Sequence, residues 1–126
     1  MFEVKDDLSI HITRGNIGVL GISAENKDKT PYNFQIGDVV RLGVFEKKKF
    51  TSIKLQKDII VQEQGTEVQI SLNKEDTTIG NIINAPVDYW YEIELNPNTN
   101  PQTIIGYDED GAKIFRLYPE GVEAEW

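Results

Sequence analysis

His11 is the only histidine of the 126-residue chain, and the chain contains no cysteine. An imidazole can act as a general acid or base near neutral pH when a partner group in a cleft perturbs its pKa. Apolar and polar residues alternate from Leu8 to Thr13, which indicates a β-strand and predicts His11 on its solvent-facing side. A lone imidazole without thiolates also provides too few ligands for a typical zinc site. We therefore expect no catalytic or metal-binding role for His11.

Asp108, Asp110 and Gly111 have the residue types that open a calcium-binding loop. A complete loop needs a bidentate carboxylate further along, at about the position of Tyr118, and helices on both sides. Glu120 is out of register for that role, and the flanking residues alternate as strands do. A tight turn in which Gly111 takes a positive φ accounts for the same residues. We expect a turn here, and no metal site.

The sequence offers no recognised catalytic or cofactor-binding constellation. It lacks the Gly-x-Ser-x-Gly, P-loop and His-Glu-x-x-His patterns. The glycines at 15, 18 and 21 lack the strand-to-helix context of a dinucleotide site. Many pairs of carboxylates could be drawn for glycoside hydrolysis, but spacing in sequence does not set the separation that this mechanism needs. We therefore expect a protein that is not an enzyme and binds no cofactor.

Trp90 is the residue whose type and position point most directly to recognition. In the alternating run from residue 87 to 95 it falls on the polar face with Glu92 and Glu94. An exposed aromatic ring surrounded by polar groups is a common anchor at protein interfaces. Two arrangements are open: an interface centred on these three residues, or packing of the ring under the loop at 96–101. Trp126 is the second candidate interface residue, either frayed or docked on a neighbour.

The charge balance argues against nucleic acid as a partner. The chain has 21 acidic and 13 basic residues, a net charge of -8. A duplex-binding surface needs clustered Lys and Arg to displace counterions, and the only basic run is 47–49. The apolar stretches are too short to span a bilayer, and the first twelve residues are too charged for a signal peptide. We expect a soluble, unsecreted protein with neither nucleic acid nor membrane as partner.

Two-residue periodicity dominates the chain and predicts short strands separated by turns. The length suits one domain spanning residues 1–126. The last two strands are expected to form a hairpin across the turn at 108–111. This pattern predicts an all-β sandwich or barrel. The predicted strands lie at residues 8–12, 19–24, 40–44, within 50–61, and at 68–72, 87–95, 103–107 and 113–118.

One segment breaks the strand pattern between residues 74 and 83. Asn73 is a candidate N-cap with Asp76 three positions later, and Glu75 and Asp76 favour a helix N-terminus through the helix dipole. Gly80 interrupts the segment early. The sequence therefore predicts one short helical turn near residues 74–83, which carries the chain from one sheet to the other.

Several blocks of the sequence resemble phage virion proteins. The opening run Asp7–Asn16, a hydrophobic alternation followed by Arg-Gly-Asn, is similar to the N-terminal domain of the phage baseplate upper protein family. Ser71–Thr77 and Tyr89–Leu95 resemble further blocks of that family. The whole chain also resembles small stand-alone prophage proteins of Gram-positive bacteria, whose closing blocks are similar to Asn96–Tyr107 and Gly111–Phe115.

The resemblance implies an immunoglobulin-like antiparallel β-sandwich of about 7–9 strands. It also implies a tail or baseplate structural or assembly module that acts through protein–protein contacts. The implied partners are other phage tail or baseplate proteins and further copies of the chain. The implied location is the virion, or the host cytoplasm during assembly. The alternative hypothesis is a carbohydrate-binding module for host-surface adhesion, with Trp90 as its platform and Glu92 and Glu94 beside it.

Overall fold

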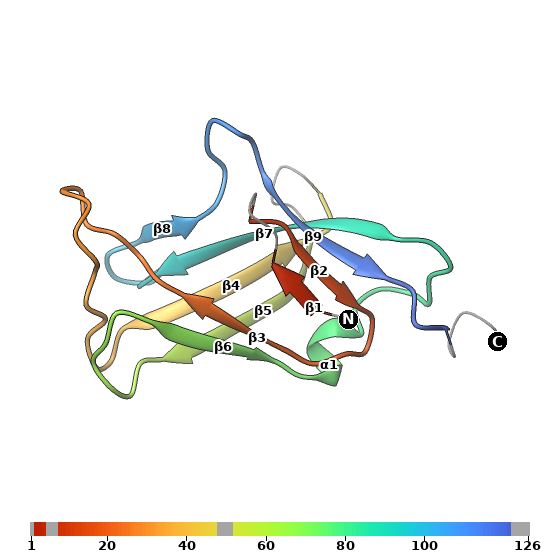
Figure 1. Ribbon diagram of the computed structural model, residues 1–126, viewed down its shortest axis with the longest axis horizontal. Coiled ribbons are helices and arrows are strands. Elements are labelled where there is room, and N and C mark those ends of the chain that lie inside the picture. The colour runs from red at the N-terminus through yellow and green to blue at the C-terminus, as the bar shows by residue number, and fades with distance from the viewer. Residues whose placement is uncertain (1, 5–7, 48–51, 122–126) are drawn as a thin grey trace.

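The computed structural model describes residues 2–4, 8–47 and 52–121, and their regular structure is almost entirely β (Figure 1). The short helix α1 lies between β6 and β7, as the sequence predicts. The all-β class is confirmed. In chain order the elements are β1 (Phe2–Val4), β2 (Ile10–Thr13), β3 (Gly18–Ile22), β4 (Val39–Phe45), β5 (Ile53–Ile60), β6 (Val68–Leu72), α1 (Lys74–Thr77), β7 (Val87–Leu95), β8 (Gln102–Ile105) and β9 (Lys113–Tyr118).

The strands form a large sheet and a small one, stacked face to face. The large sheet has the order β1-β2-β9-β7-β4-β5, with β8 also paired to β7, and the small sheet is β3-β6. Figure 1 shows β3 and β6 crossing in front of β4 and β5. An immunoglobulin variable-type sandwich likewise places strands C, F, G and C′ in one sheet and B and E in the other. Here β4, β7, β9 and β5 face β3 and β6, so the fold is an all-β sandwich.

One pairing departs from the predicted antiparallel sandwich. Strand β2 runs parallel to β9, from the Ile10–Phe115 pair to the Thr13–Tyr118 pair, whereas every other ladder is antiparallel within the described residues. Parallel strands cannot be joined by a tight turn. The first and last parts of the chain therefore meet only through long-range folding, which local periodicity does not reveal.

The core fills the space between the two sheets. The inward row of β7 contains Tyr89, Tyr91, Ile93 and Leu95, all buried, and it packs with the inward rows of β4 and β9. The small sheet covers this layer with Leu20, Ile22, Val68, Ile70 and Leu72. Full burial of one such aliphatic side chain contributes roughly 1.5–3 kcal/mol relative to its exposure. The alternation seen in the sequence thus marks the faces of the sandwich.

The predicted hairpin between the last two strands is wrong. Both β8 and β9 pair antiparallel with β7, β8 along its second half and β9 along its first half. Two strands that are both antiparallel to a third run in the same direction, so they cannot form a hairpin with each other. The nine residues of β7 extend about 30 Å, which is enough to pair with two short strands in succession. The turn itself exists, closed by a bridge between Asp108 and Gly111.

Helix α1 begins where the sequence predicts. The Asn73 side chain accepts from the Asp76 backbone N–H at 2.9 Å, and the Asp76 carboxylate accepts from the Asn73 backbone N–H at 2.9 Å. This reciprocal capping box satisfies two amide groups that the helix leaves unpaired. The helix ends at Thr77, short of the predicted 74–83, and Gly80 follows at φ +70°.

The turn after β2 is tied to the segment after α1 by buried hydrogen bonds. The Arg14 guanidinium, only 4% exposed, donates to the carbonyls of Ile79 at 3.5 Å and Gly80 at 3.0 Å. The Thr77 hydroxyl donates to the Asn16 carbonyl at 2.7 Å. The turn at residues 14–16 and the segment at residues 77–80 therefore meet in space, although they are distant in sequence.

The Asp76 carboxylate supports both α1 and the edge of the large sheet, because it also accepts from the Lys57 ammonium of β5 at 2.5 Å. We expect Asp76→Ala to lower the free energy of unfolding by about 1–2 kcal/mol, through loss of the cap and of a half-buried ion pair. Urea denaturation measures the change. Glu75→Ala, in the same helical turn, is the matched control. Equal losses in the two variants would contradict this assignment.

Candidate functional site

The outward-facing side chains of the large sheet form a continuous surface over four strands. Along β7 these are Asp88, Trp90, Glu92 and Glu94, half-buried and alternating with the buried row, as the sequence predicts. We call this surface the Trp90 face. It consists of Arg41, Gly43 and Phe45 of β4, Ile53, Gln56 and Asp58 of β5, Asp88, Trp90, Glu92 and Glu94 of β7, and Ile114 and Arg116 of β9.

Trp90 lies in an apolar row that crosses the middle of the large sheet. Its register partners are Phe45 on β4 and Ile114 on β9, one on each side. The loop at 96–101 joins β7 to β8 and begins beyond Leu95, about 17 Å further along the strand. Trp90 therefore does not pack under that loop. Its neighbours come from adjacent strands, and the ring contributes to the outer surface.

A shallow hollow of about 230 Å³ opens beside this row, between β5, β4 and β7. Gly43 forms part of its lining, and a Cβ added to Gly43 would lie 3.0 Å from the Phe45 ring, so the ring covers the glycine. This arrangement shields a strand glycine with an aromatic neighbour. The remaining lining residues are Arg41, Ile53, Gln56, Glu92 and Glu94. The aromatic residue of the hollow is thus Phe45 and not Trp90.

Two carboxyl groups share the β7 side of the hollow. Burial raises the pKa of Glu92 above its usual range, and the neighbouring carboxylate of Glu94 raises it further by charge repulsion and a hydrogen bond. Deprotonation of both groups places two like charges beside each other in a partly desolvated site. A cationic or hydrogen-donating group brought by a partner would therefore interact favourably with this pair.

Two bidentate ion pairs lie at the rim of the Trp90 face. Arg41 Nε and Nη2 donate to the Asp58 carboxylate at 2.8 and 2.9 Å, and Arg116 donates to Asp88 at 2.6 and 3.1 Å. The hydrogen bond from Arg41 lowers the pKa of Asp58, and Asp88 raises the pKa of Arg116. Paired guanidinium groups are held in fixed orientation. The face has an apolar centre, a carboxyl pair and charged margins.

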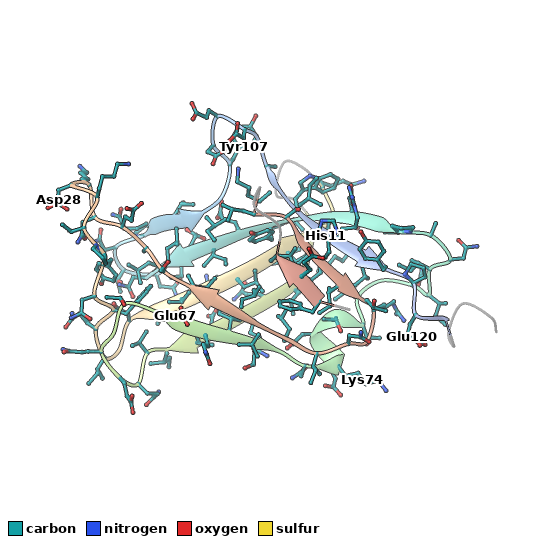
Figure 2. The ribbon with its side chains drawn as sticks, in the orientation of Figure 1. His11, Asp28, Glu67, Lys74, Tyr107 and Glu120 are labelled. Carbon is teal, nitrogen blue, oxygen red and sulfur yellow. The ribbon has the colours of Figure 1, made fainter. Side chains whose placement is uncertain are left out.

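The predicted solvent-facing position of His11 is wrong. His11 is 9% exposed, and Figure 2 shows it on β2 beside β9. Its Nε2 lies 3.0 Å from the Ser9 hydroxyl, and its Nδ1 lies 2.7 Å from the Tyr118 hydroxyl. Strands β1 and β9 flank β2 on both sides, and the Tyr118 ring stacks on the imidazole. Ser9 is 6% exposed, so this hydroxyl–imidazole pair has the spacing of a nucleophile and base without access for a substrate.

The acidic turn after β8 is organised by the protein's own groups. The Asp108 carboxylate accepts from the Lys113 ammonium at 2.6 Å and from the Asp110 backbone N–H at 2.9 Å. Gly111 takes φ +93°, as predicted for this turn. Lys113 supplies the positive charge that a bound cation would bring. Residues 2–4, 8–47 and 52–121 contain no group of three or more His, Cys, Asp or Glu side chains arranged to hold a metal.

Sequence reasoning missed most of the hollow. Phe45, Ile53 and Gln56 join Glu92 and Glu94 only because β4 lies between β5 and β7 in the large sheet. The signal for one part was present, since residues 41, 43 and 45 alternate with the apolar row of β4. No signal in the sequence indicated the strand order, which places β5 and β7 on either side of β4. Trp126 lies outside the described residues.

No family model matches the chain, and no curated protein or solved structure matches it either. Within the described residues, none of the helical structure is long and apolar enough to cross a membrane. The relationship to phage baseplate proteins therefore stays a prediction from the sequence blocks.

The carboxyl pair predicts a pH-dependent gain in stability on neutralisation. Because the pKa of Glu92 is raised in the folded state, ionisation of this carboxyl lowers the free energy of unfolding. The penalty is absent at pH values where the carboxyl is protonated in both the folded and the unfolded state. We expect Glu92→Gln to raise the free energy of unfolding by roughly 0.5 kcal/mol at pH 7, a value limited by solvent screening. The gain should disappear near pH 3. Urea midpoints at the two pH values measure it.

Glu63→Gln, on an exposed loop, is the control for this change, and it should leave the free energy of unfolding unaltered at both pH values. A loss of stability in Glu92→Gln at neutral pH would show that the ionised Glu92 side chain stabilises the fold.

Proposed function

We propose that this chain is a non-enzymatic structural or assembly module of a phage tail or baseplate, and that it acts through protein–protein contacts. The observation that carries the proposal is the Trp90 face, where an apolar row crosses an otherwise charged sheet surface. The proposed partners are other tail or baseplate proteins. The proposed location is the virion, or the host cytoplasm while the particle is being assembled.

The composition of the Trp90 face supports a protein partner. Protein interfaces concentrate aromatic residues and arginine at their centre and keep charged groups at a solvated rim. Here Trp90, Phe45 and Ile114 form the centre, and the Arg41–Asp58 and Arg116–Asp88 pairs form opposite margins. Tryptophan and arginine are also the residues that most often dominate binding energy. The sheet presents these groups on rigid backbone, so binding them costs little ordering.

The phage context rests on the sequence blocks. The Glu-Asp-Thr block contacts the Arg-Gly-Asn block through the Thr77 hydroxyl, which donates to the Asn16 carbonyl, and Arg14 donates to the Gly80 carbonyl just beyond it. These contacts support a structural role for both blocks. A module of this kind contributes surfaces to an assembly, which agrees with the class of protein that the blocks resemble.

Incorporation into particles tests the proposal. Phage particles purified from a strain that encodes this chain should contain it, as measured by quantitative mass spectrometry. Trp90→Ala removes the centre of the face, and Glu94→Lys reverses a charge beside it. We expect each to reduce incorporation at least tenfold, because loss of a buried aromatic anchor costs 2 kcal/mol or more, about 30-fold in affinity.

Tyr107→Ala is the control. Tyr107 is 67% exposed, stands on the loop between β8 and β9 (Figure 2), and belongs neither to the residues of the Trp90 face nor to the lining of its hollow. Its incorporation should equal that of the wild type, and urea unfolding should show that all three variants remain folded. Absence of the wild-type chain from purified particles would count against the proposal, as would full incorporation of folded Trp90→Ala.

The hollow favours carbohydrate binding as the second candidate. An aromatic ring with amide and carboxyl groups around it is the chemistry of a sugar site, and Phe45, Gln56, Glu92 and Glu94 provide these groups around one hollow. The platform differs from the one predicted from the sequence, because Phe45 rather than Trp90 borders the hollow.

Glycan-array binding separates the two candidates. If the chain is an adhesion module, we expect it to bind cell-wall saccharides, with affinity reduced at least tenfold in Phe45→Ala and in Gln56→Ala. Tyr107→Ala should bind as the wild type does. Absence of binding to any saccharide would remove this candidate and leave the protein-interface proposal untouched.

A further inference from the structure

Strand β5 is a long exposed edge of the large sheet. It has eight residues, a length of about 27 Å, and within the described residues its only strand partner is β4. In the part of the chain that the structure describes, no second strand pairs with the backbone N–H and C=O groups along its outer edge. Such an edge is a template for pairing with another strand unless the chain blocks it.

The charges along β5 are arranged in opposite signs at positions that share a strand face. Lys54 forms an ion pair with Glu46 at 3.2 Å, and Asp58 forms one with Arg41 at 2.8 Å. Both Lys54 and Asp58 are exposed. Each end of β5 therefore carries one positive and one negative group, and the four charges sum to zero. The chain's overall net charge of -8 does not create repulsion at this edge.

This pattern is self-complementary in one register. When two copies of a strand pair antiparallel about a two-fold axis in one continuous sheet, the residues opposite each other share a face, so the axis passes through a residue. An axis at Lys57 places two lysines opposite each other, and an axis at Asp58 places two aspartates opposite each other. An axis at Gln56 places Lys54 of each copy opposite Asp58 of the other.

We propose that the chain forms a homodimer by antiparallel pairing of β5 with β5 of a second copy, with the two-fold axis at Gln56. The ion pairs already present then join across the axis. Arg41 and Asp58 of one copy meet Lys54 and Glu46 of the other, which gives alternating charges in an unbroken row. The large sheets become one continuous sheet. Opposite charges in direct cross-strand positions stabilise such pairs.

The dimer goes beyond the function proposed above, because it uses the edge of the sheet and leaves most of the Trp90 face free. A bulge supports the role of Lys54. The β4 partner of Leu55 is Val44 and that of Ile53 is Phe45, so Lys54 has no partner residue in β4. An extra residue there leaves the Lys54 side chain with more freedom to reach a group on a neighbouring strand.

Single cysteine variants test the register directly, because the chain has no cysteine of its own. In the proposed pairing the two copies of residue 56 face each other with their Cα atoms about 4.5–5.5 Å apart, within the range of a disulfide. The two copies of residue 60 lie about 27 Å apart. Under mild oxidation we expect Gln56→Cys to form a disulfide dimer at least tenfold faster than Ile60→Cys, as measured by non-reducing electrophoresis.

Charge reversal in mixed samples provides a second test that does not depend on cysteine. The dimer contains two symmetry-related contacts between residue 54 of one copy and residue 58 of the other. Lys54→Asp alone makes both of these contacts aspartate against aspartate, and Asp58→Lys alone makes both lysine against lysine. A mixture of the two variants restores opposite charges at both positions. By analytical ultracentrifugation we expect each variant alone to dimerise at least tenfold more weakly than the wild type, and the mixture to recover dimer as a heterodimer.

Equal oxidation rates for Gln56→Cys and Ile60→Cys would overturn the proposal, and so would a mixture that stays as monomeric as its components. Far-ultraviolet circular dichroism of each variant separates loss of pairing from loss of fold. A monomeric wild-type chain that still enters phage particles would refute the dimer and leave the function proposed above intact.

Discussion

The two-residue alternation of β7 is the constraint on which the rest of the molecule depends. The strand pairs with β4 on one side and with β9 and β8 in succession on the other. Its inward row, including Tyr91 and Ile93, is the centre of the core, and its outward row carries Trp90 and the carboxyl pair. A slip of one residue would exchange the two rows. Stability and surface chemistry are therefore fixed by the same register.

The carboxyl pair and the ion pairs show how this surface balances competing effects. Arg41 forms an ion pair with Asp58, and Arg116 forms one with Asp88, so the charges at the margins are neutralised by neighbouring side chains. Among the described residues no cation forms an ion pair with Glu92, and burial together with Glu94 raises its pKa. The cost of keeping these like charges adjacent is small on a half-exposed sheet, and a partner that brings a hydrogen-bond donor would remove it.

Much of the fold could be predicted from the sequence, because apolar and polar residues alternate along the strands and so mark which side chains are buried. The bounds of β6 and β7 match the predicted 68–72 and 87–95, and α1 begins at the predicted Asn73 cap. The short strand β1 was not predicted, since three residues carry too little periodicity. The face on which Trp90 lies followed from the alternation alone. These features share one property: each depends on neighbours along the chain.

The features that escaped prediction depend on strand order. His11 occupies a polar position on its strand yet is buried, because β1, β9 and the ring of Tyr118 surround it. The prediction of a hairpin between the last two strands was wrong, because β7 is long enough to pair with β8 and β9 in succession. The hollow beside Phe45 joins three strands whose adjacency no local pattern records. Alternation gives each strand two faces and does not say which strands stand next to one another.

The parallel ladder between β2 and β9 has a consequence during synthesis. Residues 10–13 leave the ribosome well before their partners at 115–118. Until then β2 can pair only with β1, and its apolar side, including Ile10 and Ile12, is open to wrong association. Contacts so distant in sequence also slow folding. Because β9 lies between β2 and β7, the large sheet cannot be assembled across that position until β9 has been made.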